Sequence, residues 1–415
     1  MPPVASYLPC AVFAPEDDSD LGIPRVLISP PRYIQGSGVL DHIGRYLSIV
    51  PSRRPALLAS AGGQERDGAR LLASLRTAEC DPVAATFTGE CSDEEIARLV
   101  DVLGGAQPAV DSVIAFGGGK CIDTGKCVAA LLGVPVVVCP SLASNDAPTS
   151  AIAVVYTSSG VSKEVRYFPH SPALVVVDTR VVAEAPARYL VAGIGDAMAT
   201  WYEARTCAKN PDARSELGAR PTLAAIALAE LCATTLFADG PAAVEAVSRR
   251  EVTTALERVV EANTLLSGIG FESGGLAAAH GIAHGCTTLP EVHRHFLHGE
   301  MVAIGVLIQL VLESDEIEAR RVAEFFARVG LPIHLGQLGI SAEDSVAADR
   351  VMQQAALLGF VGNEPLEVTP AVLLAATERA DALGREIAEK VGDSAYWELR
   401  KSQGRVGPER SPVGE

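Results

Sequence analysis

The chain has 415 residues, of which 48% are apolar and 20% are charged, and its formal net charge is −17. This length predicts about two domains with substantial apolar interiors, and the composition excludes a disordered chain. The acidic balance argues against nucleic acid or an anionic membrane as a partner.

Cysteine usage and the N-terminal sequence bear on the compartment. The nine cysteines contain no CxxC pair, and several stand in apolar runs, which is typical of reduced, buried thiols. The chain opens without a charged-then-apolar leader, and we find no run of 18 apolar residues. We therefore expect a cytoplasmic protein that does not span a membrane.

The first part of the chain alternates between strand and helix signals. Residues 1–23 lack a clear period and are interpreted as an N-terminal extension. Short apolar runs then predict strands at residues 25–29, 56–60, 112–116, 134–139, 151–157 and 173–178. Helical patterns lie between some of them, at residues 92–103, with Ser92 as the N-cap, and at 123–132. This alternation predicts an α/β domain with a mostly parallel sheet over residues 24–186.

The second part has a different pattern, because strand signals all but vanish after Pro186. Long amphipathic or small-residue segments predict helices at residues 187–206, 220–237, 242–265, 275–288, 301–313, 319–329 and 370–390. We therefore expect an all-α domain over residues 187–396. The tail, residues 397–415, is expected to be frayed.

A glycine-rich turn follows one of the predicted strands. Gly117, Gly118 and Gly119 come directly after the strand at 112–116, and Lys120 and Asp123 follow them. Glycines at a strand-to-helix turn let backbone N–H groups approach an anion, and the next helix directs its positive end there. The spacing matches neither GxGxxG nor GxxxxGK[ST]. The glycine turn is therefore interpreted either as a phosphate cradle or as a simple tight turn.

Histidines cluster in one short segment. Five of the eight, His280, His284, His293, His295 and His298, fall within nineteen residues. The spacing of His280 and His284 places both imidazoles on one face of a helix. Because imidazole is a common ligand for zinc and the usual proton carrier near neutral pH, the cluster indicates a metal site, a proton-transfer site, or both.

Several motifs in one order give the chain a family resemblance. It resembles the bacterial glycerol dehydrogenases, within the superfamily of iron-containing alcohol dehydrogenases and dehydroquinate synthases. The matching segments are Tyr33-Ile-Gln-Gly36, 117–126, 143–150, 177–179, 192–203, 275–280, His298-Gly-Glu300, 362–365 and 380–385. The resemblance covers residues 25 to 396. It implies a dinucleotide-binding N-terminal domain, an all-α C-terminal domain, and a metal and substrate in the cleft between them.

The resemblance implies a three-residue metal site. The family's ligands fall on Asp196, His280 and His298, and all three motif positions are intact. One carboxylate and two imidazoles leave an open coordination position, as catalytic zinc sites require, while iron(II) also accepts these ligands. The superfamily's iron enzymes often carry a further histidine four residues after the aspartate. Here Thr200 stands at that position, which favours zinc.

The resemblance also implies NAD or NADP as cofactor. The expected cofactor-binding residues are Gly117, Gly118, Gly119, Lys120, Asp123, Ser141, Ser144, Thr149 and Ser150. After the strand at 56–60 the family usually places an aspartate that binds the adenosine ribose. This chain has Ser60 there, with Arg66 downstream. Losing that carboxylate removes repulsion against a 2′-phosphate, so we expect NADP to be tolerated or preferred.

Two further residues are candidates for catalysis. Asp146 corresponds to a family residue that contacts polyol hydroxyls; the less favoured alternative is an Asx-turn or N-cap before Ala147-Pro148. His284 follows His280 at a spacing more like the iron-type and dehydroquinate synthase branches, where this histidine relays protons. The alternative is a packed helix histidine. His293 and His295 are expected to be loop or surface residues.

These expectations converge on an enzyme. The predicted activity is a metal-dependent, NAD(P)-linked alcohol dehydrogenase that oxidises a vicinal diol or polyol, or reduces its ketone or aldehyde, and assembles as a homo-oligomer. A glycerol-1-phosphate-type dehydrogenase is an alternative and would need basic groups such as Lys163 and Arg166. A dehydroquinate synthase-like cyclase is less favoured because it carries Glu where this chain has Asp196. A non-catalytic binding protein is least favoured.

Overall fold

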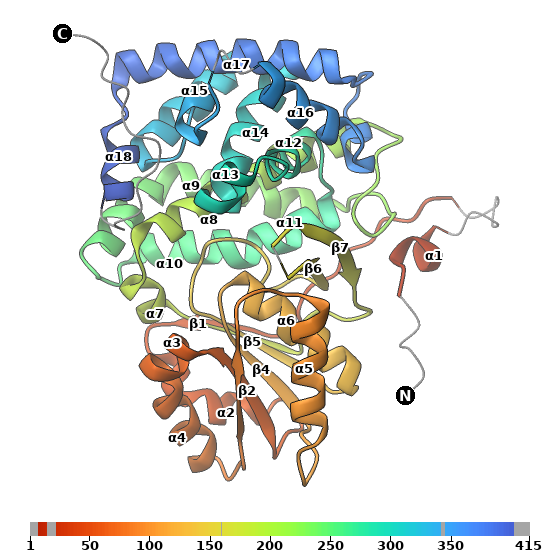
Figure 1. Ribbon diagram of the computed structural model, residues 1–415, viewed down its shortest axis with the longest axis vertical. Helices are drawn as coiled ribbons and strands as arrows, with labels where there is room; N and C mark the ends of the chain where they lie inside the picture. Colours follow the sequence, from red (N-terminus) through yellow and green to blue (C-terminus); the bar gives the residue numbers. More distant parts are fainter. Residues whose placement is uncertain (1–6, 15–21, 159, 342–344, 402–415) are drawn as a thin grey trace.

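The computed structural model describes residues 7–14, 22–158, 160–341 and 345–401. Its N-terminal part contains a six-stranded parallel sheet in the order β1-β8-β5-β4-β2-β3, as expected from the sequence. Figure 1 shows this sheet below the helical part. Its strands are β1 (Tyr33–Gly36), β2 (Pro55–Ser60), β3 (Val83–Phe87), β4 (Ser112–Gly117), β5 (Val136–Pro140) and β8 (Leu174–Asp178).

Helices cover both faces of this sheet. Successive residues of a strand point to opposite faces, so Leu57 and Ile114 join one apolar core and Leu58 and Val113 the other. The first core packs on α2 and α4, and the second on α5 and α6. The helices of this part are α2 (Ile43–Leu47), α3 (Ala61–Gly63), η2 (Gln64–Gly68), α4 (Ala69–Thr77), α5 (Asp93–Gly104) and α6 (Gly119–Leu132), with η1 (Val39–His42) before α2.

The strand order changes direction between β2 and β4. β2 pairs with β3 on one side and with β4 on the other, so the chain continues from this point in opposite directions. In open parallel sheets ligands bind at the carboxyl ends of the strands at such a switch point. Ser60 ends β2 and Gly117 ends β4, so the two turns singled out in the sequence lie at this switch point.

Some strand predictions were wrong. Residues 25–29 form no strand; Arg25 makes only an isolated bridge with Arg220, and the edge strand is β1 instead. Residues 151–157 do form a strand, β6 (Ile152–Tyr156), but it pairs antiparallel with β7 (Ser162–Tyr167) in a separate hairpin. The sequence did not predict β3 or β7, because each is partly exposed and polar residues interrupt its apolar run.

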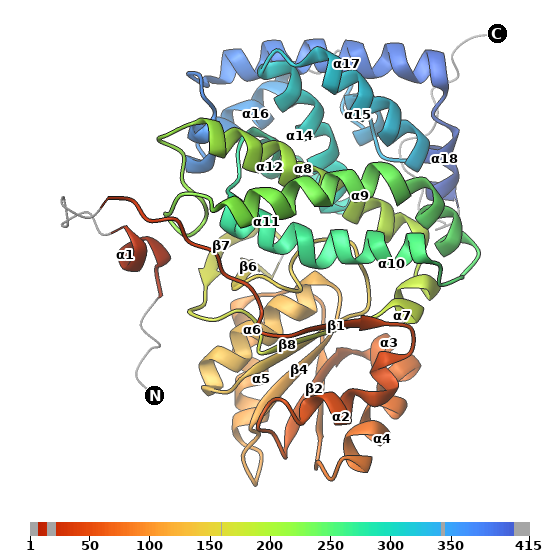
Figure 2. The ribbon, with the colours of Figure 1, turned by 180° about the vertical axis from the view of Figure 1, so that it is seen from behind.

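The C-terminal part is helical, as predicted, with no strand in residues 187–341 and 345–401. Helix α14 is buried on nearly all sides at its centre (Figure 2). The elements are α7 (Thr179–Glu184), α8 (Ala187–Lys209), α9 (Leu223–Ser248), α10 (Thr254–Glu261), η3 (Ala262–Leu266), α11 (Ser267–Gly274), α12 (Ala278–Cys286), α13 (Pro290–His295), α14 (His298–Leu312), α15 (Glu316–Val329), η4 (Leu335–Leu338), α16 (Ser345–Ala356), η5 (Gly359–Asn363), α17 (Pro370–Val391) and α18 (Ser394–Lys401).

The break predicted between residues 237 and 242 was wrong. Helix α9 continues through Pro241, and Gly240 packs against Phe325, so tertiary contacts override the local signal. The next helix begins after Thr253, whose hydroxyl accepts from the backbone N–H of Leu256. By length and composition α9 could cross a membrane. It packs on α8, α10 and α11.

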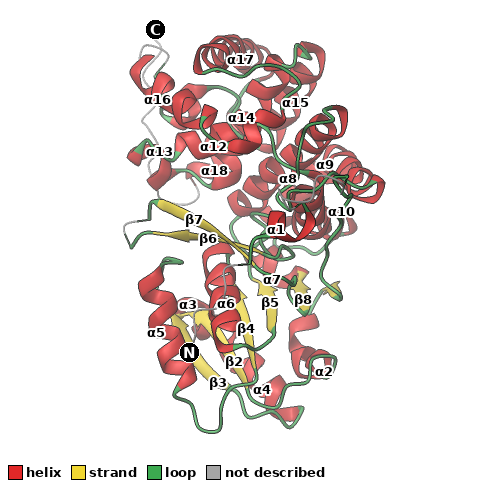
Figure 3. Cartoon of the chain, turned by 90° about the vertical axis from the view of Figure 1, so that its right-hand side faces the viewer, coloured by secondary structure: helices red, strands yellow, loops and turns green. Residues whose placement is uncertain are grey.

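Parts of both terminal segments are ordered. The N-terminal extension contains α1 (Pro9–Phe13), seen beside the helical part in Figure 3, while residues 1–6 and 15–21 lie outside the described residues. The tail was predicted to fray from residue 397, but α18 reaches Lys401. Its Arg400 is buried between the rings of Phe296 and Tyr396, each 4.4 Å from the guanidinium carbon. Residues 402–415 lie outside the described part.

Candidate metal centre and active site

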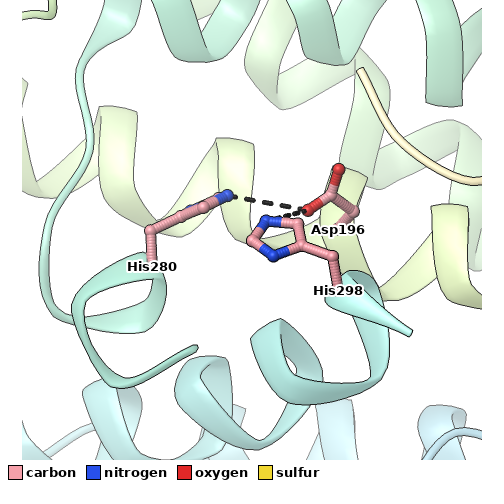
Figure 4. Close-up of side chains that lie close together, drawn as sticks. All are labelled: Asp196, His280 and His298. Atoms are coloured by element: carbon pink, nitrogen blue, oxygen red, sulfur yellow. Dashed lines mark ion pairs between the residues drawn. The ribbon is translucent and has the colours of Figure 1, made fainter. Parts of the chain in front are cut away.

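Three of the predicted residues meet in the helical part. Asp196 lies in α8, His280 in α12, and His298 is the first residue of α14. Nε2 of His280 is 3.6 Å from Oδ1 of Asp196, and Nε2 of His298 is 3.4 Å from the same oxygen (Figure 4). One ligand atom from each residue lies within 4.8 Å of the others. The sequence thus identified a group whose members lie up to 102 residues apart.

Close packing of α8 on α14 brings Asp196 to His298. A Cβ on Gly299 would stand 1.8 Å from the carbonyl oxygen of Ala192, and one on Gly195 would stand 2.3 Å from that of Gly299. Only glycine fits at both contacts. Arg188 lies one turn before Ala192 in α8. It forms a bidentate ion pair with Glu300 of α14, with both N–O distances 2.7 Å. These contacts fix the two helices in register.

The charges at this site fit a cation. Asp196 is 1% exposed, and neither of its carboxylate oxygens has a hydrogen-bond partner. Burial alone would raise its pKa, but His298 and His280 hold it below the usual value. For His280, burial would lower the pKa, while Glu203 and Asp196 raise it well above normal. A buried carboxylate without donors, facing two imidazoles, is a set of ligands that zinc satisfies.

Asp146 stands beside this trio. The hydroxyl of Ser267 donates to its Oδ2 at 3.3 Å, and Thr200 contacts that hydroxyl at 2.8 Å. Burial and the charge of Asp196 raise the pKa of Asp146 to about 8, a shift that a cation at Asp196 would reduce. The Asx-turn considered for Asp146 belongs instead to Asn145, whose Oδ1 accepts from the N–H of Ala147. Thr200 is engaged with Ser267 rather than with the metal ligands.

The other histidines separate into two groups. The ring of His284 is centred 6.2 Å from that of His298 and 6.1 Å from that of Phe360. Burial, His298 and His280 lower the pKa of His284 to about 3. By contrast, His293 and His295 lie on α13. His293 donates to the carbonyl of Gly160 in the β6–β7 turn, and His295 pairs with Glu291 at 3.3 Å, so both serve other contacts.

The glycine turn lies between β4 and α6, at the switch point of the sheet. A Cβ on Gly117 would lie 2.6 Å from that of Cys121, and one on Gly119 would lie 2.5 Å from the side-chain nitrogen of Asn145. The glycines are therefore required by close packing; their φ angles do not demand them. No side chain caps the N-terminus of α6, so its N–H groups are available to a phosphate. Lys120, on the first turn, is ion paired with Glu90.

The remaining predicted cofactor residues surround this turn but are largely engaged within the protein. Ser141 is buried and donates its backbone N–H to the carbonyl of Gly117, while Ser144 is half-buried. Thr149 donates its hydroxyl to the carbonyl of Thr264 at 2.9 Å. Ser150 accepts from the buried ammonium of Lys126 at 3.1 Å.

Lys126 was not singled out in the sequence, yet it joins the cofactor and substrate segments. Its Nζ donates to the carbonyls of Ala147 at 2.6 Å and Ile152 at 2.7 Å. Asp123 lies 3.3 Å from this ammonium and accepts from the N–H of Val154. Asp123 and Lys126 thus tie α6 to the segment that carries Asp146. The only available signal was a lysine one turn after an aspartate on a predicted helix.

The basic groups considered for a substrate phosphate lie elsewhere. Lys163 and Arg166 belong to β7, and both are ion paired with Asp93 at the start of α5. The groups nearest the metal ligands are instead carboxylates, including Glu203 on His280 and Asp146. This charge distribution disfavours an anionic substrate.

Comparison with known proteins identifies similar molecules. Residues 30–179 match the family model described as iron-containing alcohol dehydrogenase. The chain is 44% identical to a glycerol dehydrogenase of Escherichia coli O6:H1, over 88% of this chain and 99% of that protein. It is 41% identical to a glycolaldehyde reductase of Halobacterium salinarum, over 88% and 99% respectively. It superimposes on the crystal structure of glycerol dehydrogenase from Schizosaccharomyces pombe with a TM-score of 0.85 and 32% identity, covering 89% and 94% of the two chains.

The metal centre yields a direct prediction. Replacing Asp196 by alanine removes the carboxylate that neutralises the cation, so we expect zinc affinity to fall by at least about 100-fold. Zinc content after desalting, measured by atomic emission, checks this. His295→Ala is the matched control, because His295 belongs to the same cluster but contacts Glu291. A D196A protein with full zinc content would contradict the assignment.

Proposed function

The chain belongs to the iron-containing alcohol dehydrogenase family and is a glycerol dehydrogenase-like polyol dehydrogenase, and on that premise we propose that it uses zinc to oxidise a short vicinal diol such as glycerol. The observation that carries the proposal is the buried, unpartnered carboxylate of Asp196 facing Nε2 of His280 and Nε2 of His298. These three residues would hold the metal.

The chain's own residues then have distinct parts in the reaction. When bound, zinc would act as a Lewis acid on a substrate hydroxyl and nicotinamide would accept the hydride. The uncapped end of α6 binds the dinucleotide phosphates. Asp146, held by Ser267, hydrogen-bonds the neighbouring hydroxyl and so orients a vicinal diol. His284, whose ring is centred 6.2 Å from that of His298, would take the released proton and pass it to solvent.

The first prediction of this proposal concerns substrate and metal. Reduced nicotinamide absorbance should rise with glycerol and 1,2-propanediol, and 1,3-propanediol is the matched control because its hydroxyls are not adjacent. We expect kcat/KM for 1,2-propanediol to exceed that for 1,3-propanediol by about 10- to 100-fold. Dialysis against a chelator should abolish the activity and added zinc should restore it. Full activity in chelator-treated protein would contradict the proposal.

The second prediction concerns the cofactor, for which we propose that NADP is tolerated or preferred. Ser60 caps the helix that follows β2, accepting from the N–H of Gly63, and Arg66 on the next turn is exposed. Residues 60–64 contain no carboxylate that would repel a 2′-phosphate; the first ones after β2 are Glu65 and Asp67, on either side of Arg66 in η2. We expect kcat/KM for NADP to equal or exceed that for NAD.

A variant sharpens this cofactor test. Ser60→Asp would set a carboxylate against the 2′-phosphate, and we expect kcat/KM for NADP to fall by about 10- to 100-fold while that for NAD is retained. Steady-state rates with both cofactors measure this. A wild-type preference for NAD of about a hundredfold or more would refute it.

The third prediction concerns His284. If it carries the proton, His284→Ala should lower kcat by about 100-fold, a magnitude typical of a lost acid–base group. Zinc content should not change, because the metal ligands are intact. The assay is kcat at saturating substrate beside metal analysis, with His295→Ala again as the control. Unchanged kcat would assign His284 to helix packing instead.

A further inference from the structure

A buried carboxylate stands behind one of the proposed metal ligands. Glu203 lies in α8 and has no solvent exposure. Its Oε2 is 2.5 Å from Nδ1 of His280, and its Oε1 accepts from the backbone N–H groups of Ala277 at 2.8 Å and His280 at 2.9 Å. Both oxygens are therefore engaged by the first turn of α12.

The spacing of Asp196 and Glu203 along α8 explains why both side chains face the His280 ring. Glu203 follows Asp196 by seven residues, which is two helical turns, so both side chains project from the same face. The His280 ring lies between them, with Nδ1 toward Glu203 and Nε2 toward Asp196. One rigid helix thus contacts both nitrogens of the same imidazole.

The chemistry of the pair determines which nitrogen is free. An ionised carboxylate only accepts hydrogen bonds, so the nitrogen that faces Glu203 carries the proton. The lone pair of a neutral imidazole is then on Nε2, which faces Asp196 and His298. In metal sites a carboxylate behind a ligating histidine fixes its tautomer and orientation and raises its basicity.

We propose that Glu203 is a positioning residue that holds His280 in the Nε2-ligating tautomer and thereby sets the affinity of the site for its metal. This inference rests on the metal site of the proposed function. It assigns Glu203 no contact with substrate or cofactor. If Glu203 has this role, replacing it lowers the affinity for the metal while the fold and the dinucleotide site stay intact.

Glu364 supplies a matched control at the same helix end. It is also buried, and its Oε1 accepts from the N–H of Ala278 at 3.1 Å. Among the described residues its hydrogen bonds do not include the His280 ring. Burial raises the pKa of Glu364 to about 8, so glutamine is close to its neutral form in charge and size. Glu203 and Glu364 thus both cap α12, but only Glu203 bonds the imidazole.

The test compares Glu203→Gln and Glu364→Gln in the full-length, zinc-loaded protein. A glutamine amide at 203 presents a donor as well as an acceptor, so it cannot serve the helix N–H groups and Nδ1–H together. Zinc transfer to a chromogenic chelator should show an affinity about 10- to 100-fold lower in E203Q and within about threefold of wild type in E364Q. Cobalt-substituted E203Q should show altered visible d–d bands, while NADH binding by fluorescence is unchanged.

The outcomes separate the two claims. Zinc affinity in E203Q equal to that of wild type overturns the inference and leaves the proposed function standing. Failure of the wild-type protein to bind zinc at Asp196, His280 and His298 overturns the proposed function first. If E203Q is insoluble, Glu203→Asp and Glu364→Asp replace the pair. The carboxylate of E203D is withdrawn by one methylene, so E203D should bind zinc at least about tenfold more weakly than E364D; equal affinity also overturns the inference.

Discussion

The charge of Asp196 is the constraint on which the helical half of the molecule depends. A carboxylate buried without donors is unfavourable by several kcal/mol unless a cation or a proton compensates it. The chain supplies two imidazole nitrogens that face it, one from α12 and one from α14. A divalent cation among these three groups would balance that charge. The proposed metal would thus serve both the reaction and the buried electrostatics.

Helix α8 organises the groups around that charge. Three of its successive turns present Asp196 to the metal position, Thr200 to Ser267 and so to Asp146, and Glu203 to His280. The glycine contacts with α14 and the ion pair of Arg188 with Glu300 prevent the helix from shifting along its neighbour. The proposed metal, substrate and tautomer roles therefore share one support, and Lys126 ties α6 to the segment that follows Asp146.

The sequence predicted the two-part architecture through its strand–helix alternation, and the family resemblance of the motifs around Asp196, His280 and His298 pointed to three residues that the structure brings together. It missed β3 and β7, which are partly exposed and whose apolar runs are interrupted by polar residues. It also missed the roles of Lys126 and Glu203, because their partners lie 21 and 77 residues away and pairing across such distances leaves no periodic signal. The sequence set His293 and His295 apart from the other three histidines; the structure places both on a short helix, α13, where they make other contacts.

The most direct test is the position and coordination of the metal. Crystals of the zinc-loaded protein, with anomalous data collected on both sides of the zinc absorption edge, should show one peak per chain. The peak should lie about 2.0–2.2 Å from a carboxylate oxygen of Asp196 and from Nε2 of both His280 and His298. A peak bound through His284, His293 or His295 instead, or ligation of His280 through Nδ1, would contradict the arrangement derived from α8.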